Sequence, residues 1–502
     1  MESRAAVPGM ASHVPPQARS RLTLPVVLTG VGVVAMSISG TAIALPSIGR
    51  DLDASGSPLS WVVAGYNLAF AAMTLVAGSA SDRAGRRRIF LVAAAIFSAG
   101  SLVTALAPTI LVVDVSRVVA GAGGAGVMAA GGALLASGYV GAARNRAFAF
   151  MGTMAGVGIA VGPTLVGLLI SVAGWRGSFV VFAVVGAVIL LGAGRLSESR
   201  SAGARTDWVG SLLFVGTLVC LMFVLLEAPV LGMSDPAVLL TSALAVVGLI
   251  AFVLVQRRSD AQVLAPELVA HRGFMGWCLA TLTTSIGFLG VLVFLPTYLQ
   301  AAAQLAPSTA GLVMLLLTAP VLLTPVLAVA LVNRGVSARL VIMIALALVT
   351  VGNFCLLVLG PENTTALIAA PLLMIGVGMG SSFGITDGQA MSLVPAGLVG
   401  TAAGFLNTLR GAAEAVVIAA FSAALLGSLT QRLGDAEHAA AVSAGRLGID
   451  PGAEIAALTS SWHLTQVGVG GICLVLSVVI AILLFARSTG PTQTRRDTGA
   501  AR

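Results

Sequence analysis

Residues 78–88 read Gly-Ser-Ala-Ser-Asp-Arg-Ala-Gly-Arg-Arg-Arg, a short polar and basic stretch in a largely apolar chain. It joins two long apolar segments, near residues 59–80 and 89–107. Gly85 permits a tight reversal between two helices. Asp82 can lie against a helix N-terminus or pair with an arginine, and such a contact can form and break during a conformational change. A basic connector between apolar segments indicates a cytoplasmic loop of a multi-span membrane protein.

The composition supports a membrane environment. Of the 502 residues, 58% are hydrophobic and 9% are charged, against about 25% charged residues in soluble domains. These values exclude a soluble enzyme, a disordered scaffold and a secreted disulfide protein. The apolar runs are too long for the strands of an outer-membrane barrel, so they predict an all-α integral membrane protein. The four cysteines lie inside apolar runs without metal-ligand spacing, and we expect no metal site and no cofactor.

A membrane-spanning helix needs about 20 apolar residues, and the sequence contains fourteen suitable runs. They lie near residues 24–46, 59–80, 89–107, 109–136, 146–173, 178–195, 208–227, 236–256, 274–299, 309–332, 338–359, 364–393, 398–426 and 463–486.

The arginines test this topology. All 27 basic residues are arginine, and placing both termini in the cytoplasm puts 21 of them in cytoplasmic segments and 4 in external loops. The remaining two, Arg117 and Arg410, lie at membrane depth. The positive-inside rule therefore supports an even number of spans. We expect a multi-pass protein of a bacterial inner membrane with both termini cytoplasmic, in which the basic charge reflects topology rather than a nucleic-acid partner.

The spacing of the runs suggests five regions. They are a cytoplasmic tail (1–21), a six-helix bundle (22–195), two extra spans with cytoplasmic linkers (196–272), a second six-helix bundle (273–486) and a cytoplasmic tail (487–502). The second bundle includes a long external loop at about 427–461. Two helical bundles with a site between them are the arrangement of many secondary transporters.

Three motifs, taken together, resemble those of the major facilitator superfamily. Residues 78–88 resemble its loop signature, and residues 117–125 resemble its fourth-helix motif, with Ala120 in place of the usual Gln. The third motif, residues 158–167, resembles the fifth-helix antiporter motif, with Val166 in place of one Gly. The resemblance implies the fourteen-span drug:proton antiporter branch, with two six-helix bundles and two extra central helices. It also implies conformational gating by Asp82, Arg83, Gly85, Arg86, Gly158, Gly162, Pro163 and Gly167.

Ionisable residues inside apolar runs are costly and therefore point to function. Asp114 and Arg117 lie three residues apart, and Arg410 and Glu414 lie four apart, so each pair shares a helix face. Either pair could be a structural ion pair or a proton-coupling group. Asp387 has no charged partner in its own span, which favours protonation or exposure to a cavity.

The first span departs from the family pattern. Members of the family usually carry an acid at the position of Ser37, and a serine cannot exchange a proton near neutral pH. Coupling could then depend on Asp114, lie in the second half, or not follow the usual proton route, and we favour the second half. The proton-coupling candidates are Asp387, Glu414, Asp114, Arg117 and Arg410.

An apolar substrate pocket with a few polar groups is expected between the two halves. Its candidate residues are Met36, Ser37, Tyr66, Asn67, Phe70, Phe294, Tyr298, Gln300, Phe405 and Asn407. With no catalytic motif in the sequence, we predict a monomeric, non-enzymatic exporter of small amphipathic drugs in exchange for protons. Two alternatives are an exporter of a lipid or endogenous metabolite, and a non-transporting sensor or scaffold.

Overall fold

The computed structural model describes residues 21–139, 141–199, 208–258, 271–361, 365–383, 385–394, 399–448 and 450–485. Both predicted tails, apart from residue 21, and most of the two linkers beside the extra spans lie outside these ranges. The elements assigned in the described part are helices, as the composition predicts.

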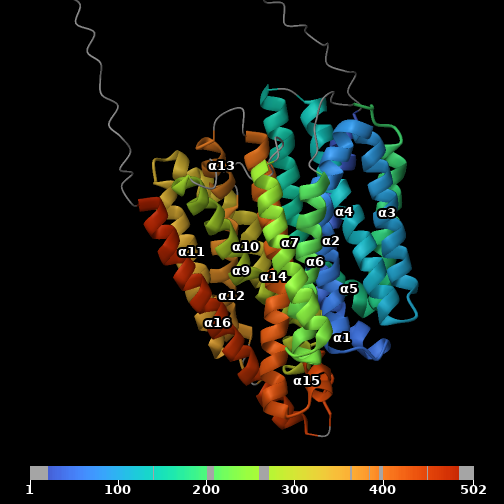
Figure 1. Ribbon diagram of the computed structural model, residues 1–502, viewed down its shortest axis with the longest axis vertical. Helices are drawn as coiled ribbons and strands as arrows, with labels where there is room; N and C mark the ends of the chain where they lie inside the picture. Colours follow the sequence, from blue (N-terminus) through green and yellow to red (C-terminus); the bar gives the residue numbers. More distant parts are fainter. Residues whose placement is uncertain are drawn as a thin grey trace, which may run out of the picture.

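The first half of the chain forms long helices that run side by side (Figure 1). They are α1 (Thr23–Asp51), α2 (Gly56–Ala84), α3 (Arg86–Leu106), α4 (Ile110–Gly138) and α5 (Gly141–Ala193). Helix α5 has 53 residues and contains a non-helical glycine, Gly174, with φ of 70°. At about 1.5 Å per residue such a helix is far longer than a bilayer is thick.

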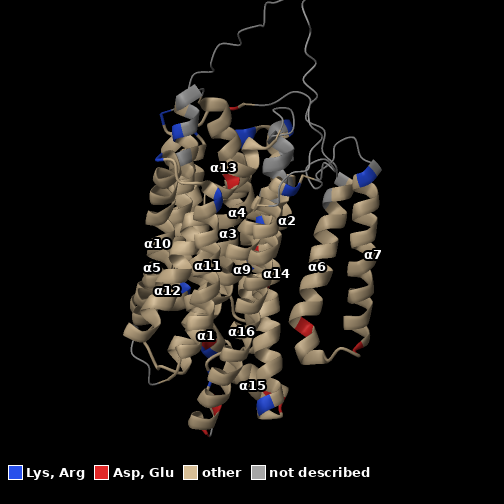
Figure 2. Cartoon of the chain, turned by 90° about the vertical axis from the view of Figure 1, so that its left-hand side faces the viewer, with Lys and Arg blue, Asp and Glu red and all other residues tan. Residues whose placement is uncertain are grey.

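Helices α6 (Trp208–Leu231) and α7 (Pro236–Arg258) pack against each other and stand beside the rest of the molecule (Figure 2). Helix α6 also touches α2 and α14. The charged residues gather mainly at the two ends of the molecule, as expected for a protein whose middle lies in hydrocarbon (Figure 2).

The second half repeats the pattern of long helices. They are α9 (Arg272–Ala301), α10 (Pro307–Asn333), α11 (Ala338–Cys355) with the short η1 (Leu356–Val358), α12 (Thr365–Ser382), α13 (Ile385–Ser392), α14 (Val399–Leu433), α15 (Ala436–Ser443) and α16 (Pro451–Phe485). Figure 1 shows α13 toward one end of the long axis and α15 toward the other. We call these the α13 end and the α15 end.

Within the described ranges, twelve helical segments are long and apolar enough to cross a membrane. The loop predicted at about 427–461 is shorter than expected, because α14 continues to Leu433 and α16 begins at Pro451. Leu429 and Leu458 extend these helices because both side chains are buried. The short helix α15 lies in the remaining connection.

Glycines in α4 set the separation of the helices in the first half. A Cβ atom at Gly121 would lie 2.3 Å from the backbone oxygen of Tyr66 in α2, and one at Gly123 would lie 2.4 Å from the backbone nitrogen of Phe97 in α3. Small residues allow such close backbone contact, which drives helix association in lipid. The glycine-rich run after Arg117 therefore brings α2 and α3 against α4.

This packing gives a first prediction. We expect Gly121→Ala to reduce the yield and thermal stability of the folded protein, because the Tyr66 carbonyl is backbone and cannot move aside locally. Gly152→Ala in α5 is the matched control, since a Cβ there meets nothing within 4 Å. Size-exclusion profiles and unfolding temperatures of the two purified variants test the prediction. Equal stability of both variants would contradict it.

Candidate functional site

The carboxylate of Glu198, in the segment that follows α5, binds the connection between α2 and α3. Gly85 makes the reversal with φ of 113°, and the backbone N–H groups of Arg87 and Arg88 donate to Glu198 at 3.1 Å and 3.3 Å. An acid at a helix N-terminus compensates its unsatisfied N–H groups and its dipole. Arg83 is exposed and Arg86 is partly buried, while the side chain of Asp82 lies outside the described residues. Glu198 thus occupies the kind of position that the sequence suggested for Asp82.

The fifth-helix motif contacts two different helices. A Cβ at Gly158 would lie 2.6 Å from Ala35 Cβ, and one at Gly162 would lie 2.1 Å from Ser39 Oγ, so these glycines hold α5 against α1. Gly167 lies against the Pro307 carbonyl of α10, where a Cβ would be 2.5 Å from the oxygen. A Cβ at Gly311 of α10 would likewise lie 2.7 Å from the Pro163 carbonyl oxygen. The motif therefore packs α1 within the first half and α10 across the interface between the halves.

Further contacts join the two halves toward the α15 end. Ser60 in α2 and Ser422 in α14 share a hydrogen bond of 2.8 Å. Asp53, just after α1, forms an ion pair with Arg446, just after α15. The Gln300 amide of α9 donates to the Ile43 carbonyl of α1 at 3.2 Å. A cavity of about 30 Å³ between the halves at this end is large enough for about one water molecule, so the α15 end is closed.

Arg117 is buried in the first half, with 1% of its surface exposed. Its Nη1 donates to Ser37 Oγ at 3.0 Å and its Nε donates to the Val62 carbonyl at 3.2 Å. The guanidinium carbon lies 4.0 Å from the centre of the Tyr66 ring. Within the described ranges no ion pair links Arg117 to Asp114, so these two residues do not form the structural ion pair that their spacing allowed. The reason is that Arg117 turns toward α1 and α2.

Asp114 lies near another acid instead. Its charge is close enough to interact with that of Glu227 in α6, and its Oδ1 is buried without a hydrogen-bond partner. Glu227 accepts hydrogen bonds from the Ser57 hydroxyl and, at 3.1 Å, from Trp61 Nε1 of α2. Glu227 therefore fastens α6 to the first half. Its partners lie about 170 residues away, so spacing along the chain could not reveal this contact.

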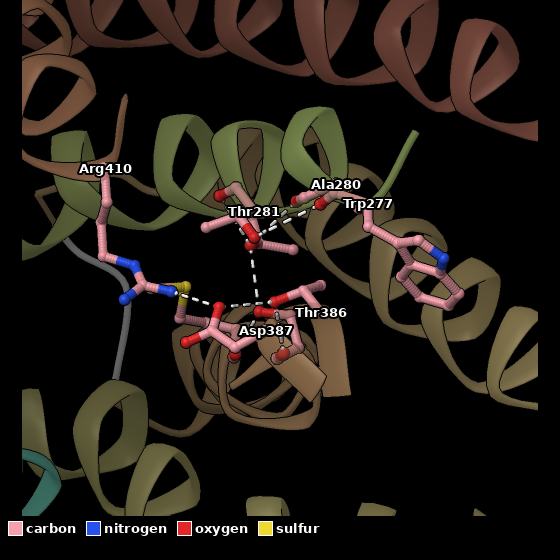
Figure 3. A network of polar contacts seen from close by, with 9 residues as sticks. Trp277, Ala280, Thr281, Thr386, Asp387 and Arg410 are labelled. Atoms are coloured by element: carbon pink, nitrogen blue, oxygen red, sulfur yellow. Dashed lines mark hydrogen bonds and ion pairs between the residues drawn. The ribbon is translucent and has the colours of Figure 1, made fainter. Parts of the chain in front are cut away.

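The second half contains one arginine beside two acids. Arg410 Nη2 in α14 donates to Asp387 Oδ1 in α13 at 2.8 Å (Figure 3). Glu414, one turn further along α14, interacts electrostatically with Arg410, but no ion pair with it is found among the described residues. The expected intrahelical pair of Arg410 and Glu414 is thus replaced by a pair between helices. Asp387 has a charged partner after all, which a view limited to its own span could not reveal.

Hydrogen bonds hold the helices around this pair. Thr386 Oγ1 donates to the Ser382 carbonyl at 3.0 Å, and Ser382 Oγ shares a hydrogen bond of 3.0 Å with Thr284 of α9. Figure 3 shows Asp387 and Thr386 facing the part of α9 that carries Thr281. The Asp387 side chain is 40% exposed and that of Arg410 19%, so solvent can reach the carboxylate.

Four of the predicted pocket residues lie in two separate clusters. Ser37 and Tyr66 surround Arg117, and Phe70 stacks on Tyr66 with ring centres 6.4 Å apart. Phe294 stacks on Phe421 at 4.8 Å, toward the α15 end. The other described members are placed as follows: Met36 is partly buried beside α5, Asn67 donates to Val63 in its own helix, Tyr298 bonds Thr459 in α16, and Gln300 bonds Ile43. The side chains of Phe405 and Asn407 lie outside the described residues.

A family model described as the Major Facilitator Superfamily matches residues 27–418. The chain belongs to this superfamily. It is a multi-pass membrane transport protein and not an enzyme. Its helical architecture also resembles solved members of other transporter groups, which shows the fold alone. A POT family transporter in complex with 5-aminolevulinic acid has a TM-score of 0.65 at 14% identity, with coverage of 91% of this chain and 95% of that one. A bacterial homologue of the human lysosomal transporter Spinster, inward-facing and occupied, has a TM-score of 0.64 at 15% identity over 92% and 95%.

Several superfamily relatives are named for antibiotic resistance. The puromycin resistance protein pur8 of Streptomyces alboniger is 30% identical over 97% of this chain and 95% of its own. The tetracenomycin C resistance and export protein of Streptomyces glaucescens is 26% identical over 97% and 96%. The multidrug resistance protein Stp of Mycobacterium tuberculosis is 29% identical over 82% and 77%.

Proposed function

We propose that this superfamily member exports small amphipathic drugs or antibiotics in exchange for protons by alternating access. Relatives that match almost the whole chain are named for resistance to, or export of, such compounds. The observation that carries the coupling mechanism is the single arginine, Arg410, beside two carboxylates, Asp387 and Glu414.

One guanidinium can balance only one of the two negative charges. A second ionised carboxylate at membrane depth would cost about 2.5–3.5 kcal/mol, so it is stabilised by binding a proton. While Arg410 is bound to Asp387, Glu414 is the acid that holds this proton. Loss of the proton would draw Arg410 toward Glu414 and release Asp387. Because Asp387 and Arg410 lie on different helices, α13 and α14, the exchange changes how these helices are held together.

The topology is part of the proposal. We infer fourteen spans. Helix α2, with 29 residues, is long enough to be a further span beside the twelve segments, and α5 is long enough to cross twice, with a break at Gly174. The two bundles would then cover residues 22–195 and 273–486, with α6 and α7 between them in sequence. The distribution of arginines favours a cytoplasmic α13 end and cytoplasmic termini in a bacterial inner membrane. We also propose that the protein is a monomer.

The test measures proton movement when substrate is added. Purified protein in proteoliposomes with an entrapped pH indicator receives puromycin, chosen because of the resistance relative. We expect the wild type to move protons, Asp387→Asn and Glu414→Gln to move none, and Asp114→Asn to retain most of the signal because it lies in the other half. Glu437→Gln, at an exposed acid of α15, is the control and should match the wild type. Unchanged flux in all three acid variants at membrane depth would remove the coupling mechanism. No flux in the wild type would remove puromycin–proton antiport.

A further inference from the structure

Arg117 is a buried cation without a carboxylate partner in the described part of the chain. The groups that accept its hydrogen bonds are the Ser37 hydroxyl and the Val62 carbonyl, and both are neutral. Asp114, three residues earlier on the same helix, forms no ion pair with Arg117, and its charge interacts with that of another acid, Glu227. A desolvated charge with only neutral partners remains costly, so the site favours a negatively charged partner from outside the chain.

The surroundings of Arg117 suit an anionic group on an aromatic body. The Tyr66 hydroxyl lies within interaction distance of Ser37, but no hydrogen bond of good geometry joins them, and Tyr66 has 0% of its surface exposed. It is therefore a buried donor still available to an acceptor. The rings of Tyr66 and Phe179 lie 4.0 Å and 5.5 Å from the guanidinium carbon. Phe70, stacked on Tyr66 and partly buried, extends the aromatic surface along α2.

Gly124 leaves room for the Tyr66 hydroxyl. A Cβ at Gly124 of α4 would lie 2.6 Å from the Tyr66 hydroxyl oxygen. Arg117 and Gly124 belong to the same run of α4, so one segment supplies both the charge and the space for the neutral donor.

We propose that Arg117, Ser37 and Tyr66 bind the carboxylate or phenolate of an aromatic amphipathic compound. This assignment rests on the proposed export function and adds to its substrates aromatic compounds that carry an acidic group. Ser37 determines the charge preference: its neutral oxygen leaves the cation uncompensated, whereas an acid at that position would neutralise Arg117 from within the chain.

The test compares two fluorescent probes with the same ring system. 1-Pyrenebutyrate carries a carboxylate, and 1-pyrenebutanol is its neutral counterpart. Binding to the purified full-length protein is measured by anisotropy in uncharged detergent with gluconate as the only other anion. We expect the wild type to bind pyrenebutyrate at least about tenfold more tightly than pyrenebutanol, equivalent to about 1.4 kcal/mol.

Two substitutions at one position separate charge from structure. Ser37→Asn keeps a neutral polar group and should retain the preference for pyrenebutyrate. Ser37→Asp places a carboxylate beside Arg117 Nη1 and should abolish the preference, and its unfolding temperature is measured to show that the variant is folded. If Arg117 has only a structural role, the wild type, Ser37→Asn and Ser37→Asp should each bind the two probes with equal affinity.

Three outcomes would overturn the assignment. They are a wild type without preference, a preference that survives in Ser37→Asp, and displacement of pyrenebutyrate by equimolar chloride, which would indicate a halide site. The measurement needs no proton gradient. Failure of puromycin–proton exchange with intact probe preference would therefore remove the transport mechanism and leave the anion site standing.

Discussion

Ser60→Cys combined with Ser422→Cys is expected to stop transport completely after oxidation, and reduction should restore it. The two hydroxyl oxygens are 2.8 Å apart on α2 and α14, close to the geometry that a disulfide requires. Alternating access demands that the closed end open once in each cycle. A covalent bond across the α15 end would prevent that step.

This cross-link has a matched control within one half. Ser428 of α14 and Ser461 of α16 are also hydrogen bonded, at 3.0 Å. A disulfide between cysteines at these positions should leave transport near the wild-type rate, because both helices are expected to move together. The four native cysteines are first replaced by alanine. Efflux from proteoliposomes is measured before and after oxidation and again after dithiothreitol. Undiminished efflux through fully cross-linked 60–422 protein would show that the α15 end does not need to open there.

The fold could be predicted largely from the sequence because membrane insertion depends on local properties. Apolar run length and arginine position mark helices and their connections, and neither requires knowledge of distant contacts. Gly85 and the glycines of α4 could also be recognised, since a tight reversal and a close helix contact favour one residue type. Length alone did not locate the ends of α14 and α16, because buried residues beyond the apolar runs prolong both helices.

The charge partners could not be predicted in the same way. Helical spacing suggested pairing of Arg410 with Glu414 and of Asp114 with Arg117, because residues three or four apart share a face. In the structure Arg410 reaches Asp387 on another helix, and Arg117 reaches Ser37. Glu227 was missed as a contact between α6 and α2. Sequence spacing limits which pairs are possible, but packing of distant segments selects among them.

Arg410→Met is expected to reduce proton-driven puromycin efflux by about a hundredfold. Without the cation, Glu414 would have to keep its proton to avoid about 2.5–3.5 kcal/mol for a buried charge, which corresponds to about that factor. Glu414 could then not release its proton during the cycle. Arg432→Met, at an exposed arginine on the same helix, is the matched control and should transport normally.

Two further variants distinguish coupling from loss of structure. Arg410→Lys keeps the charge but not the planar group, and we expect it to retain part of the activity. The double variant Arg410→Met with Asp387→Asn removes both partners of the ion pair, so its unfolding temperature should lie above that of Arg410→Met alone while transport stays absent. Efflux and unfolding are measured on the same preparations. Transport of puromycin by Arg410→Met at the wild-type rate would contradict the proposed exchange. Transport would then proceed without the cation that the two acids are proposed to share.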